Sequence, residues 1–267
     1  MTLNALMADD GTPLSYGLVG PAHGAPVLLC HGLGAAGLQF AADAEFLAGQ
    51  GYRVIVPDLR GHGASGMPAA IGPAGFSTAR LRADLLTMLD HAGMERVHWV
   101  GNSLGGILGL GMAGDAPGRL ASLTIFGTAL ALDLPSAGWL FPALDRVPGR
   151  RLTAWLTARS TTRNRAARPL IATMLGQYDA RAAAHIVDHI RHYDLSSAAL
   201  GWTGPGLVLV GGRDAAVNRV LPRQLEALRT QPNWHIADLP EGGHCANLDA
   251  TDDWRAALLN FWRAIPG

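Results

Sequence analysis

The sequence predicts an α/β protein built on a mostly parallel β-sheet. From Pro26 onward, short apolar runs alternate with longer stretches of helical spacing, the pattern of repeated strand-helix units. The runs are continuously apolar, as in Val27-Leu28-Leu29, so helices are expected to cover both faces of each strand. Glycine-rich polar segments follow several of these runs, at the edge where such sheets place their ligands.

The individual elements follow this rhythm along the chain. Residues 2–8 and 13–19 flank Asp9-Asp10-Gly11, a turn signal that predicts a β-hairpin. Further strands are expected at residues 26–30, 53–57, 97–100, 120–126, 206–210 and 234–239. Helices are expected at residues 38–50, 78–91, 103–115, 218–229 and 251–264.

The rhythm breaks between residues 131 and 204. This segment carries no convincing strand and is rich in Ala, Arg and Leu, and its helical stretches are separated by Pro135, Pro142, Pro148 and Pro169. We therefore expect a core domain of residues 1–130 and 205–267, with residues 131–204 forming a helical cap over the ligand-binding edge of the sheet. Insertions of this kind commonly carry function.

The composition argues against several classes of function. Lys plus Arg and Asp plus Glu number 21 each, so no net charge favours nucleic acid or an anionic membrane. No apolar run approaches the ~18 residues of a membrane span, and residues 1–10 lack the pattern of a signal peptide. Two cysteines, Cys30 and Cys245, make no disulfide framework. We expect a cytoplasmic monomer or homodimer whose partner is a small-molecule substrate.

The segment Gly101-Asn102-Ser103-Leu104-Gly105-Gly106 is the most informative in the chain. It joins a predicted strand to a predicted helix, and the glycines two residues to either side of Ser103 allow a very tight turn. The hydroxyl would then stand clear of the sheet at a helix N-terminus, whose free N–H groups favour developing negative charge. Ser103 is therefore the candidate nucleophile, and the alternative is a serine that caps its own helix.

A candidate acid and a candidate base follow two later strands. Asp214 ends the segment Gly211-Gly212-Arg213-Asp214, and His244 ends Gly242-Gly243-His244. Serine is a poor nucleophile at neutral pH and needs a base, which a histidine of ordinary pKa about 6.5 supplies. Asp214 would hold the imidazole in the required tautomer. The backbone N–H groups of Leu104 and of Leu33, in the loop His31-Gly32-Leu33-Gly34, would stabilise the oxyanion.

These residues resemble those of serine hydrolases of the α/β-hydrolase superfamily over essentially the whole chain. The resemblance is carried by His31-Gly32-Leu33-Gly34, Asp58-Leu59-Arg60-Gly61-His62-Gly63-Ala64-Ser65, the turn at residues 101–106, Asp214 and His244. It implies an eight-stranded, mostly parallel sheet with a cap inserted after the sixth strand. It also leaves a second candidate for the acid, because some members supply it from the position that Asp133 occupies here.

The resemblance implies hydrolysis of a carboxylic ester or lactone of a small, largely apolar substrate through an acyl-enzyme, without a cofactor. The 101–106 turn is also similar to that of hydrolases that cleave C–C bonds in ring-fission products. Those enzymes tend to carry Gly-Pro-Gly in the oxyanion loop and Trp after the catalytic His, where this chain has Leu33-Gly34-Ala35 and Cys245. Residues 31–34 and 58–63 resemble enol-lactonases, which favours an ester-type bond. Outside enzymes, the alternative is a slow, ligand-sensing protein on the same scaffold.

Candidates for the substrate pocket are His31, otherwise an organiser of its loop, and the cap residues Trp139, Phe141, Trp155, Met174 and Tyr178. The cap residues could equally form the core of the cap.

His185, His189 and His192 have the spacing of one helix face, but nothing else requires a metal and none is expected. Six arginines between residues 150 and 168 are either a site for an anionic group or a solvated face. Cys245 is expected to be a pocket-wall or packing residue.

Overall fold

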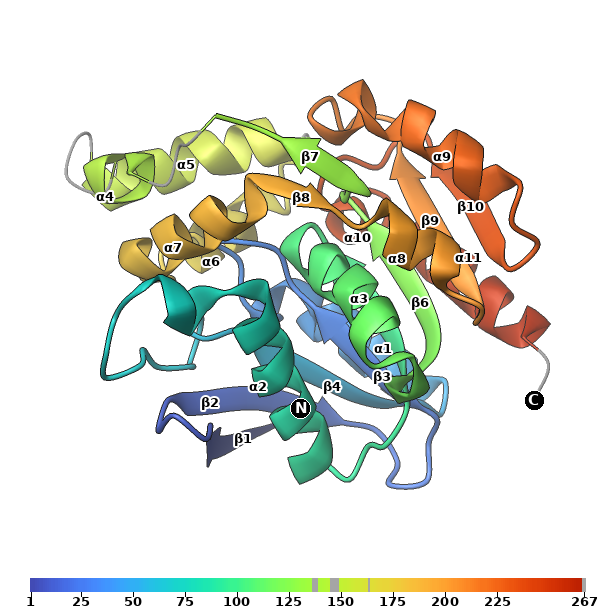
Figure 1. Ribbon diagram of the computed structural model, residues 1–267, viewed down its shortest axis with the longest axis horizontal. Coiled ribbons are helices and arrows are strands. Elements are labelled where there is room, and N and C mark those ends of the chain that lie inside the picture. The colour runs from blue at the N-terminus through green and yellow to red at the C-terminus, as the bar shows by residue number, and fades with distance from the viewer. Residues whose placement is uncertain (136–138, 145–148, 163, 266–267) are drawn as a thin grey trace.

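The computed structural model describes residues 1–135, 139–144, 149–162 and 164–265. An eight-stranded sheet runs through the molecule in the order β1-β2-β4-β3-β5-β6-β9-β10 (Figure 1). Its strands are β1 (Thr2–Met7), β2 (Pro13–Val19), β3 (Pro26–Cys30), β4 (Arg53–Asp58), β5 (Val97–Asn102), β6 (Leu120–Phe126), β9 (Gly206–Gly211) and β10 (Trp234–Leu239). The hairpin β1–β2 and the pair β2–β4 are antiparallel, and the other described pairs of this sheet are parallel. The predicted fold class is confirmed.

Helices cover both faces of this sheet. They are α1 (Ala41–Gly49), α2 (Thr78–His91), α3 (Leu104–Asp115), α8 (Ser196–Gly201), α9 (Leu221–Arg229), α10 (Ala246–Asp249) and α11 (Thr251–Ala264), with 3-10 turns η1 (Gly37–Phe40), η2 (Pro73–Phe76), η3 (Pro117–Arg119) and η5 (Val217–Arg219). Leu28 of β3 is buried with side chains from α2, α3, α8 and α9. Its neighbour Leu29 points to the opposite face and is buried with side chains from α1 and α11. Burial on both faces explains why the strands read as continuous apolar runs.

Two predicted helices begin later than the sequence pattern suggests. The segment expected at 38–50 starts with the 3-10 turn η1 and becomes α-helical at Ala41. The segment expected at 218–229 starts with η5 and becomes α-helical at Leu221, with Pro222 in its first turn. Proline is accepted there because the first N–H groups of a helix have no partner within the helix.

Between β6 and β9, the chain forms α4 (Leu140–Leu144), α5 (Arg150–Thr161), α6 (Arg168–Met174) and α7 (Ala180–Ile190). It also forms two strands, β7 (Ala131–Asp133) and β8 (His192–Asp194), which pair antiparallel as a separate ribbon. The expectation that residues 131–204 hold no strand was therefore wrong. Strands of three residues that pair across a long loop carry no local periodicity that could reveal them.

The helices α4–α7 gather beyond one edge of the sheet (Figure 1). Ala158 of α5 and Ile171 of α6 share a buried cluster with Ala36, in the loop that follows β3. Leu248 of α10 packs against the same cluster. Contacts from the helical layer therefore reach the loops at which the candidate site residues lie.

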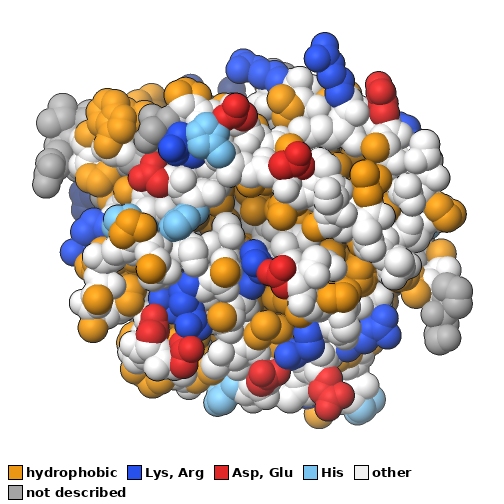
Figure 2. Space-filling model, in the orientation of Figure 1, with side chains coloured by type: hydrophobic (Ala, Val, Ile, Leu, Met, Phe, Trp, Pro, Cys, Tyr) orange, Lys and Arg blue, Asp and Glu red, His pale blue; other side chains and the backbone are white. Residues whose placement is uncertain are grey.

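The surface shows no segregation of charge on the face seen in Figure 2, where basic and acidic side chains are interspersed. This matches the equal numbers of basic and acidic residues in the sequence. Among the described residues, no helix combines the length and the apolar character that crossing a lipid bilayer requires.

Candidate active site

Ser103 lies at the turn between β5 and α3 in a strained backbone conformation. Its φ is +50° and its ψ is −114°, and among the described residues it is the one non-glycine residue with a positive φ. Such a conformation costs about 1–3 kcal/mol and persists only where the surroundings impose it. The hydroxyl of Ser103 makes no capping hydrogen bond to its own helix. The alternative, that Ser103 caps its own helix, is therefore not observed in the structure.

The flanking glycines are required by close backbone contacts. A Cβ on Gly101 would lie 2.3 Å from the carbonyl oxygen of Gly105, and a Cβ on Gly105 would lie 2.2 Å from that of Cys30. Both distances are far below van der Waals contact, and the obstructing atoms belong to the backbone. The turn therefore presses the start of α3 against the ends of β5 and β3, which leaves the side chain of Ser103 to project from the edge of the sheet.

His244 and Asp214 are paired beside this turn. Asp214 follows β9 and is buried, and its Oδ2 lies 2.9 Å from Nδ1 of His244, which follows β10. Burial alone would raise the pKa of Asp214. Hydrogen bonds from His244 and from the N–H groups of Val217 and Ala216 outweigh this and hold the pKa below its ordinary value. Asp214 is therefore a carboxylate at neutral pH, and it orients a proton on Nδ1 while leaving Nε2 of His244 able to accept one.

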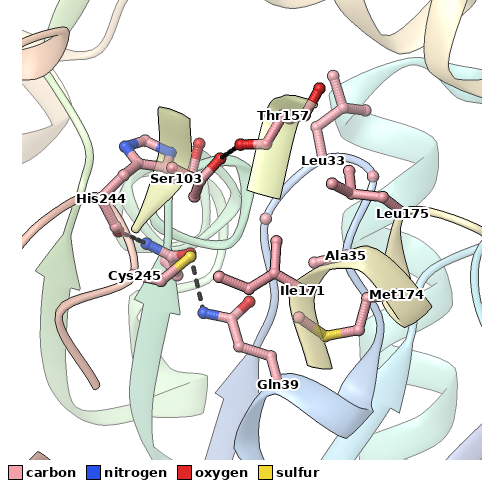
Figure 3. A pocket seen from close by; sticks show the side chains of 14 residues that line it. Leu33, Ala35, Gln39, Ser103, Thr157, Ile171, Met174, Leu175, His244 and Cys245 are labelled. Carbon is pink, nitrogen blue, oxygen red and sulfur yellow. Dashed lines mark hydrogen bonds between the residues drawn. The ribbon is translucent and has the colours of Figure 1, made fainter. Parts of the chain in front are cut away.

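Ser103 and His244 line the same two cavities, one on each side of the pair. Figure 3 shows the imidazole of His244 next to the side chain of Ser103. The residue before the serine holds this arrangement, because Nδ2 of Asn102 donates to the backbone oxygen of His244 over 2.8 Å. Ser103, His244 and the buried carboxylate of Asp214 thus come together from three different strand ends.

Asp133, the second candidate for the acid, lies elsewhere. It belongs to β7, its side chain is 86% exposed, and it forms an ion pair with His192 of β8. The side chain that contacts His244 is Asp214. Of the two carboxylates, Asp214 is the one placed to orient this imidazole.

The oxyanion loop lies against Ser103. A Cβ on Gly32 would be 3.1 Å from the Cβ of Ser103, so the backbone of the loop packs tightly against Ser103 at this point. Gly34 N–H donates to Nε2 of His62 and Ala35 N–H donates to the oxygen of Gly32. The N–H of Leu33 lies between these anchored groups and donates to no described residue.

His31 and His62 are the supports of this loop rather than part of its cavity. His31 donates from Nδ1 to the oxygen of Gly32 over 2.7 Å, and its Nε2 accepts from the N–H of Leu59 over 3.1 Å. His62 has the same pattern, with Nδ1 toward the oxygen of Arg60 and Nε2 toward Gly34. Because Nε2 must accept in both rings, both imidazoles are neutral. The inclusion of His31 among the pocket residues was wrong, since His31 lines neither cavity and both of its ring nitrogens are bonded to backbone groups.

The free energy of unfolding is expected to fall as the pH is lowered from about 6.5 toward 4. Burial lowers the pKa of His31 to about 4, and burial together with the neighbouring His31 lowers that of His62 to about 3. Below about pH 6.5 these histidines become protonated in the unfolded chain but stay neutral in the folded chain. Their contribution to the free energy of unfolding is therefore complete above about pH 6.5 and is lost as the pH falls toward the pKa values of the folded state. Urea unfolding at about pH 7.5 and pH 5 measures the loss. His62→Gln, which keeps an acceptor for Gly34, should show a smaller loss, and equal stability of the unmodified protein at both pH values would contradict the prediction.

The smaller cavity beside Ser103 has a volume of about 90 Å³. Its walls come from the oxyanion loop, from β5 and from the helical layer, where α5 supplies Thr157 and Thr161 and α6 supplies Ile171 and Met174. Figure 3 shows Thr157 extending from α5 toward Ser103, across the cavity from Gln39. Met174 is thus the cap residue for which the predicted pocket position agrees with the structure.

Three other predicted pocket residues, Trp139, Trp155 and Tyr178, lie outside both cavities. Trp139 and Trp155 are 67% and 50% exposed, because they occupy outward positions of the helical layer. Tyr178 is buried, but its ring stacks on His62 behind the oxyanion loop. The side chain of Phe141 lies outside the described residues. Aromatic residues in an amphipathic segment did not predict the pocket lining, because composition does not tell which side of a helix faces the cavity.

The larger cavity, of about 360 Å³, lies on the other side of Ser103 and His244. Its wall is mainly apolar and includes Ile107, Leu132, Tyr193 and Val217. Leu132 and Tyr193 belong to the ribbon β7–β8, the element that the sequence did not predict. Arg219 is the charged residue of this wall.

Cys245 contributes to the smaller cavity but is not prepared for nucleophilic attack. Burial, with the nearby carboxylates Asp249 and Asp214, raises the pKa of its thiol to about 12. A thiol rather than a thiolate is therefore present at neutral pH. This agrees with the expectation of a wall residue.

The histidines of α7 are not gathered around a common point. His185 stacks on Phe76, and His189 hydrogen-bonds the oxygen of Pro73. In the part of the chain that the structure describes, no three His, Cys, Asp or Glu side chains are grouped in a way that could hold a metal ion. Of the six arginines, Arg163 lies outside the described residues, and Arg159 packs over the ring of Trp155.

Comparisons with known proteins show the family and agree with the fold. The sequence profile of the family described as alpha/beta hydrolase fold matches residues 25–251. A protein from Variovorax paradoxus (strain S110), provisionally named carbamate hydrolase RutD, is 30% identical over 93% of this chain and 96% of its own. The crystal structure of a hydrolase from Pseudomonas aeruginosa PA01 has a TM-score of 0.84 at 27% identity and covers 98% of both chains. A thermophilic esterase from Thermogutta terrifontis has a TM-score of 0.83 at 25% identity, also over 98% of both chains.

Proposed function

The chain belongs to the α/β-hydrolase family, and we propose that it is a serine hydrolase that cleaves a carboxylic ester or lactone of a small, largely apolar substrate. The proposal rests on one observation. Ser103 and His244 come from the ends of two strands to the same two cavities, and Asp214, from the end of a third strand, is bonded to the imidazole of His244 from behind the cavity walls. This is the arrangement that acyl transfer through a serine requires.

In the first half of the reaction, Ser103 becomes acylated. Its Oγ attacks the substrate carbonyl while its proton passes to Nε2 of His244, and the carboxylate of Asp214 stabilises the imidazolium that forms. The carbonyl oxygen, now negative, accepts hydrogen bonds from the N–H groups of Leu33 and Leu104. When the intermediate collapses, the C–O bond to the alcohol breaks and the proton on His244 passes to the departing oxygen.

In the second half, water releases the acyl group. Nε2 of His244 takes a proton from water as its oxygen attacks the acyl carbon, and the same two N–H groups hold the second oxyanion. The bond to Ser103 then breaks, the proton returns to Oγ, and the carboxylic acid leaves. These steps use residues of the chain throughout and call for no cofactor.

Labelling with a fluorophosphonate probe, followed by peptide mapping, tests the proposal together with turnover of short p-nitrophenyl esters. We expect one label per chain, on Ser103, and many cycles of ester hydrolysis. Absence of both labelling and turnover in the folded protein would overturn the proposal. A single acylation without further cycles would instead support a ligand sensor.

Carbamate hydrolysis is a second candidate, favoured by the provisional name of the relative from Variovorax paradoxus. The same attack and the same oxyanion contacts apply to a carbamate carbonyl, which differs in carrying nitrogen on its acyl side. A panel of esters, lactones, carbamates and vinylogous diketones with a common assay separates these bond types. A value of kcat/KM for carbamates at least tenfold above that for matched esters would favour this second candidate.

A further inference from the structure

Gln39 has a buried acceptor atom that the mechanism above does not use. The residue lies in η1, is 2% exposed, and contributes to the wall of the smaller cavity. Its Oε1 accepts a hydrogen bond from no described residue. Buried amide oxygens without a partner are uncommon and costly, so an explanation is required.

The orientation of this amide is imposed by its neighbours. Nε2 of Gln39 donates to Oδ1 of Asn102 over 2.9 Å and to Oδ1 of Asn247 over 3.2 Å. Neither neighbour can turn its own nitrogen toward Gln39. Nδ2 of Asn102 is committed to the oxygens of His244 and Phe126.

Asn247 is committed in the same way. Its Nδ2 donates to Oδ2 of Asp43 over 2.9 Å and to the backbone oxygen of Gln39. Asp43 is in turn held by Arg255 over 2.8 Å. Both neighbours therefore present oxygens to Gln39, which must place its nitrogen toward them and its own oxygen on the other side. Figure 3 shows that this oxygen lies on the side of Ile171, at the floor of the cavity.

The remaining wall of the cavity offers little that could bond this oxygen. Ile171, Met174 and Leu175 are apolar, and Figure 3 shows Thr157 at the opposite end of the cavity from Gln39. The hydroxyl of Thr161 donates to the backbone oxygen of Thr157. Cys245 is nearby, but its thiol lies at 4.0 Å from Oδ1 of Asn102. None of the described residues donates to this oxygen, so an occupant of the cavity that carries a donor would satisfy it.

The two cavities are suited to different parts of the substrate, the acyl group and the alcohol. It contains the oxyanion loop, whereas the larger, mainly apolar cavity is bounded by Ser103 and His244 without that loop. The acyl group lies next to the oxyanion donors, and the departing alcohol lies next to the imidazole that protonates it. This assigns the acyl group to the smaller cavity and the alcohol to the larger one.

We propose that Gln39 selects substrates whose acyl group carries a hydrogen-bond donor, a hydroxyl or an amino N–H, close to the carbonyl carbon. The proposal rests on the serine-hydrolase function given above. A site with a fixed buried acceptor rejects an analogue that lacks the donor, because the acceptor then stays unpaired. Short hydroxyacyl esters and carbamates, whose acyl nitrogen carries hydrogen, are the substrate classes that fit.

The test compares two esters of nearly equal size, p-nitrophenyl glycolate and p-nitrophenyl propionate. They share a leaving group and differ in a hydroxyl in place of a methyl group. Each kcat/KM is divided by the rate constant for hydroxide attack on the same ester, which removes the intrinsic difference in reactivity. We expect the normalised ratio of glycolate to propionate to be about tenfold in the unmodified protein and close to one in Gln39→Met.

Asn247→Leu is the matched control. It disturbs the same hydrogen-bond network but keeps the acceptor of Gln39, so both esters should lose rate by the same factor. Gln39→Asn, which keeps an amide but withdraws it from the cavity, gives the same comparison if the Met variant does not fold.

Two results would overturn the proposal while leaving the serine hydrolase intact: a normalised ratio near one in the unmodified protein, or an equal loss of rate on both esters in Gln39→Met. The second result would make Gln39 a structural residue. Inactivity of the folded protein toward both esters and toward the fluorophosphonate probe would overturn the proposed function, and this inference with it.

Discussion

Replacing Ser103 with alanine is expected to lower kcat/KM for a p-nitrophenyl ester by at least about 10⁴-fold and to abolish fluorophosphonate labelling. The variant loses the atom that forms the covalent bond, while the oxyanion N–H groups and both cavities remain. Residual catalysis then comes from substrate binding and oxyanion stabilisation. Steady-state kinetics with gel-based labelling measures both effects.

The fold of this variant should be unaffected. Alanine has the same Cβ as serine, so the strain at a φ of +50° is unchanged, and no capping hydrogen bond is lost. Thermal unfolding checks this point. Ser196→Ala, on α8 outside both cavities, serves as the matched control and should keep both activity and labelling. Turnover by Ser103→Ala within tenfold of the unmodified protein would exclude Ser103 as the nucleophile.

Replacing Asp214 with asparagine is expected to lower kcat by about 10⁴-fold. A carboxylate only accepts hydrogen bonds and therefore keeps the proton of His244 on Nδ1. An asparagine can present its N–H₂ group instead, which favours the proton on Nε2 and removes the base that Ser103 needs. The loss should appear in kcat more than in KM, because Asp214 contributes to neither cavity described above.

Asp133→Asn is the paired control for this prediction. Asp133 is exposed and bonded to His192 in the ribbon β7–β8, so its substitution should leave kcat within about twofold of the unmodified protein. If the two substitutions were reversed in effect, the acid would be the residue after β6, and the pair Asp214–His244 would have only a structural role. The comparison needs no knowledge of the natural substrate.

Local patterns were sufficient for the central sheet and for the nucleophile turn. The strands at Pro26–Cys30 and Leu120–Phe126 have their predicted limits, because runs buried on both faces are continuous in sequence. The edge strand Trp234–Leu239 also has its predicted limits, although His235 and Asp238 in it are exposed. The turn at Ser103 could be predicted because its glycines are needed by backbone contacts within a few residues and with the adjacent strand.

The cavity walls could not be predicted in the same way. Trp139 and Trp155 are exposed, whereas Thr157 and Ile171 line the smaller cavity, and all of them lie on helical segments whose orientation depends on packing against the loop after β3. Gln39 carried no motif signal, because its importance comes from side chains of Asn102 and Asn247 that are distant in sequence.

The amino-acid sequence by itself determined the α/β architecture and the order of Ser103, Asp214 and His244 at strand ends, since these depend on local periodicity and on glycines at tight turns. The tertiary structure alone decided which carboxylate contacts His244, which helix faces form the cavities, and where the amide oxygen of Gln39 lies. Those three features depend on distances between residues far apart in the chain. Such distances are determined by tertiary packing, and local sequence patterns do not predict them.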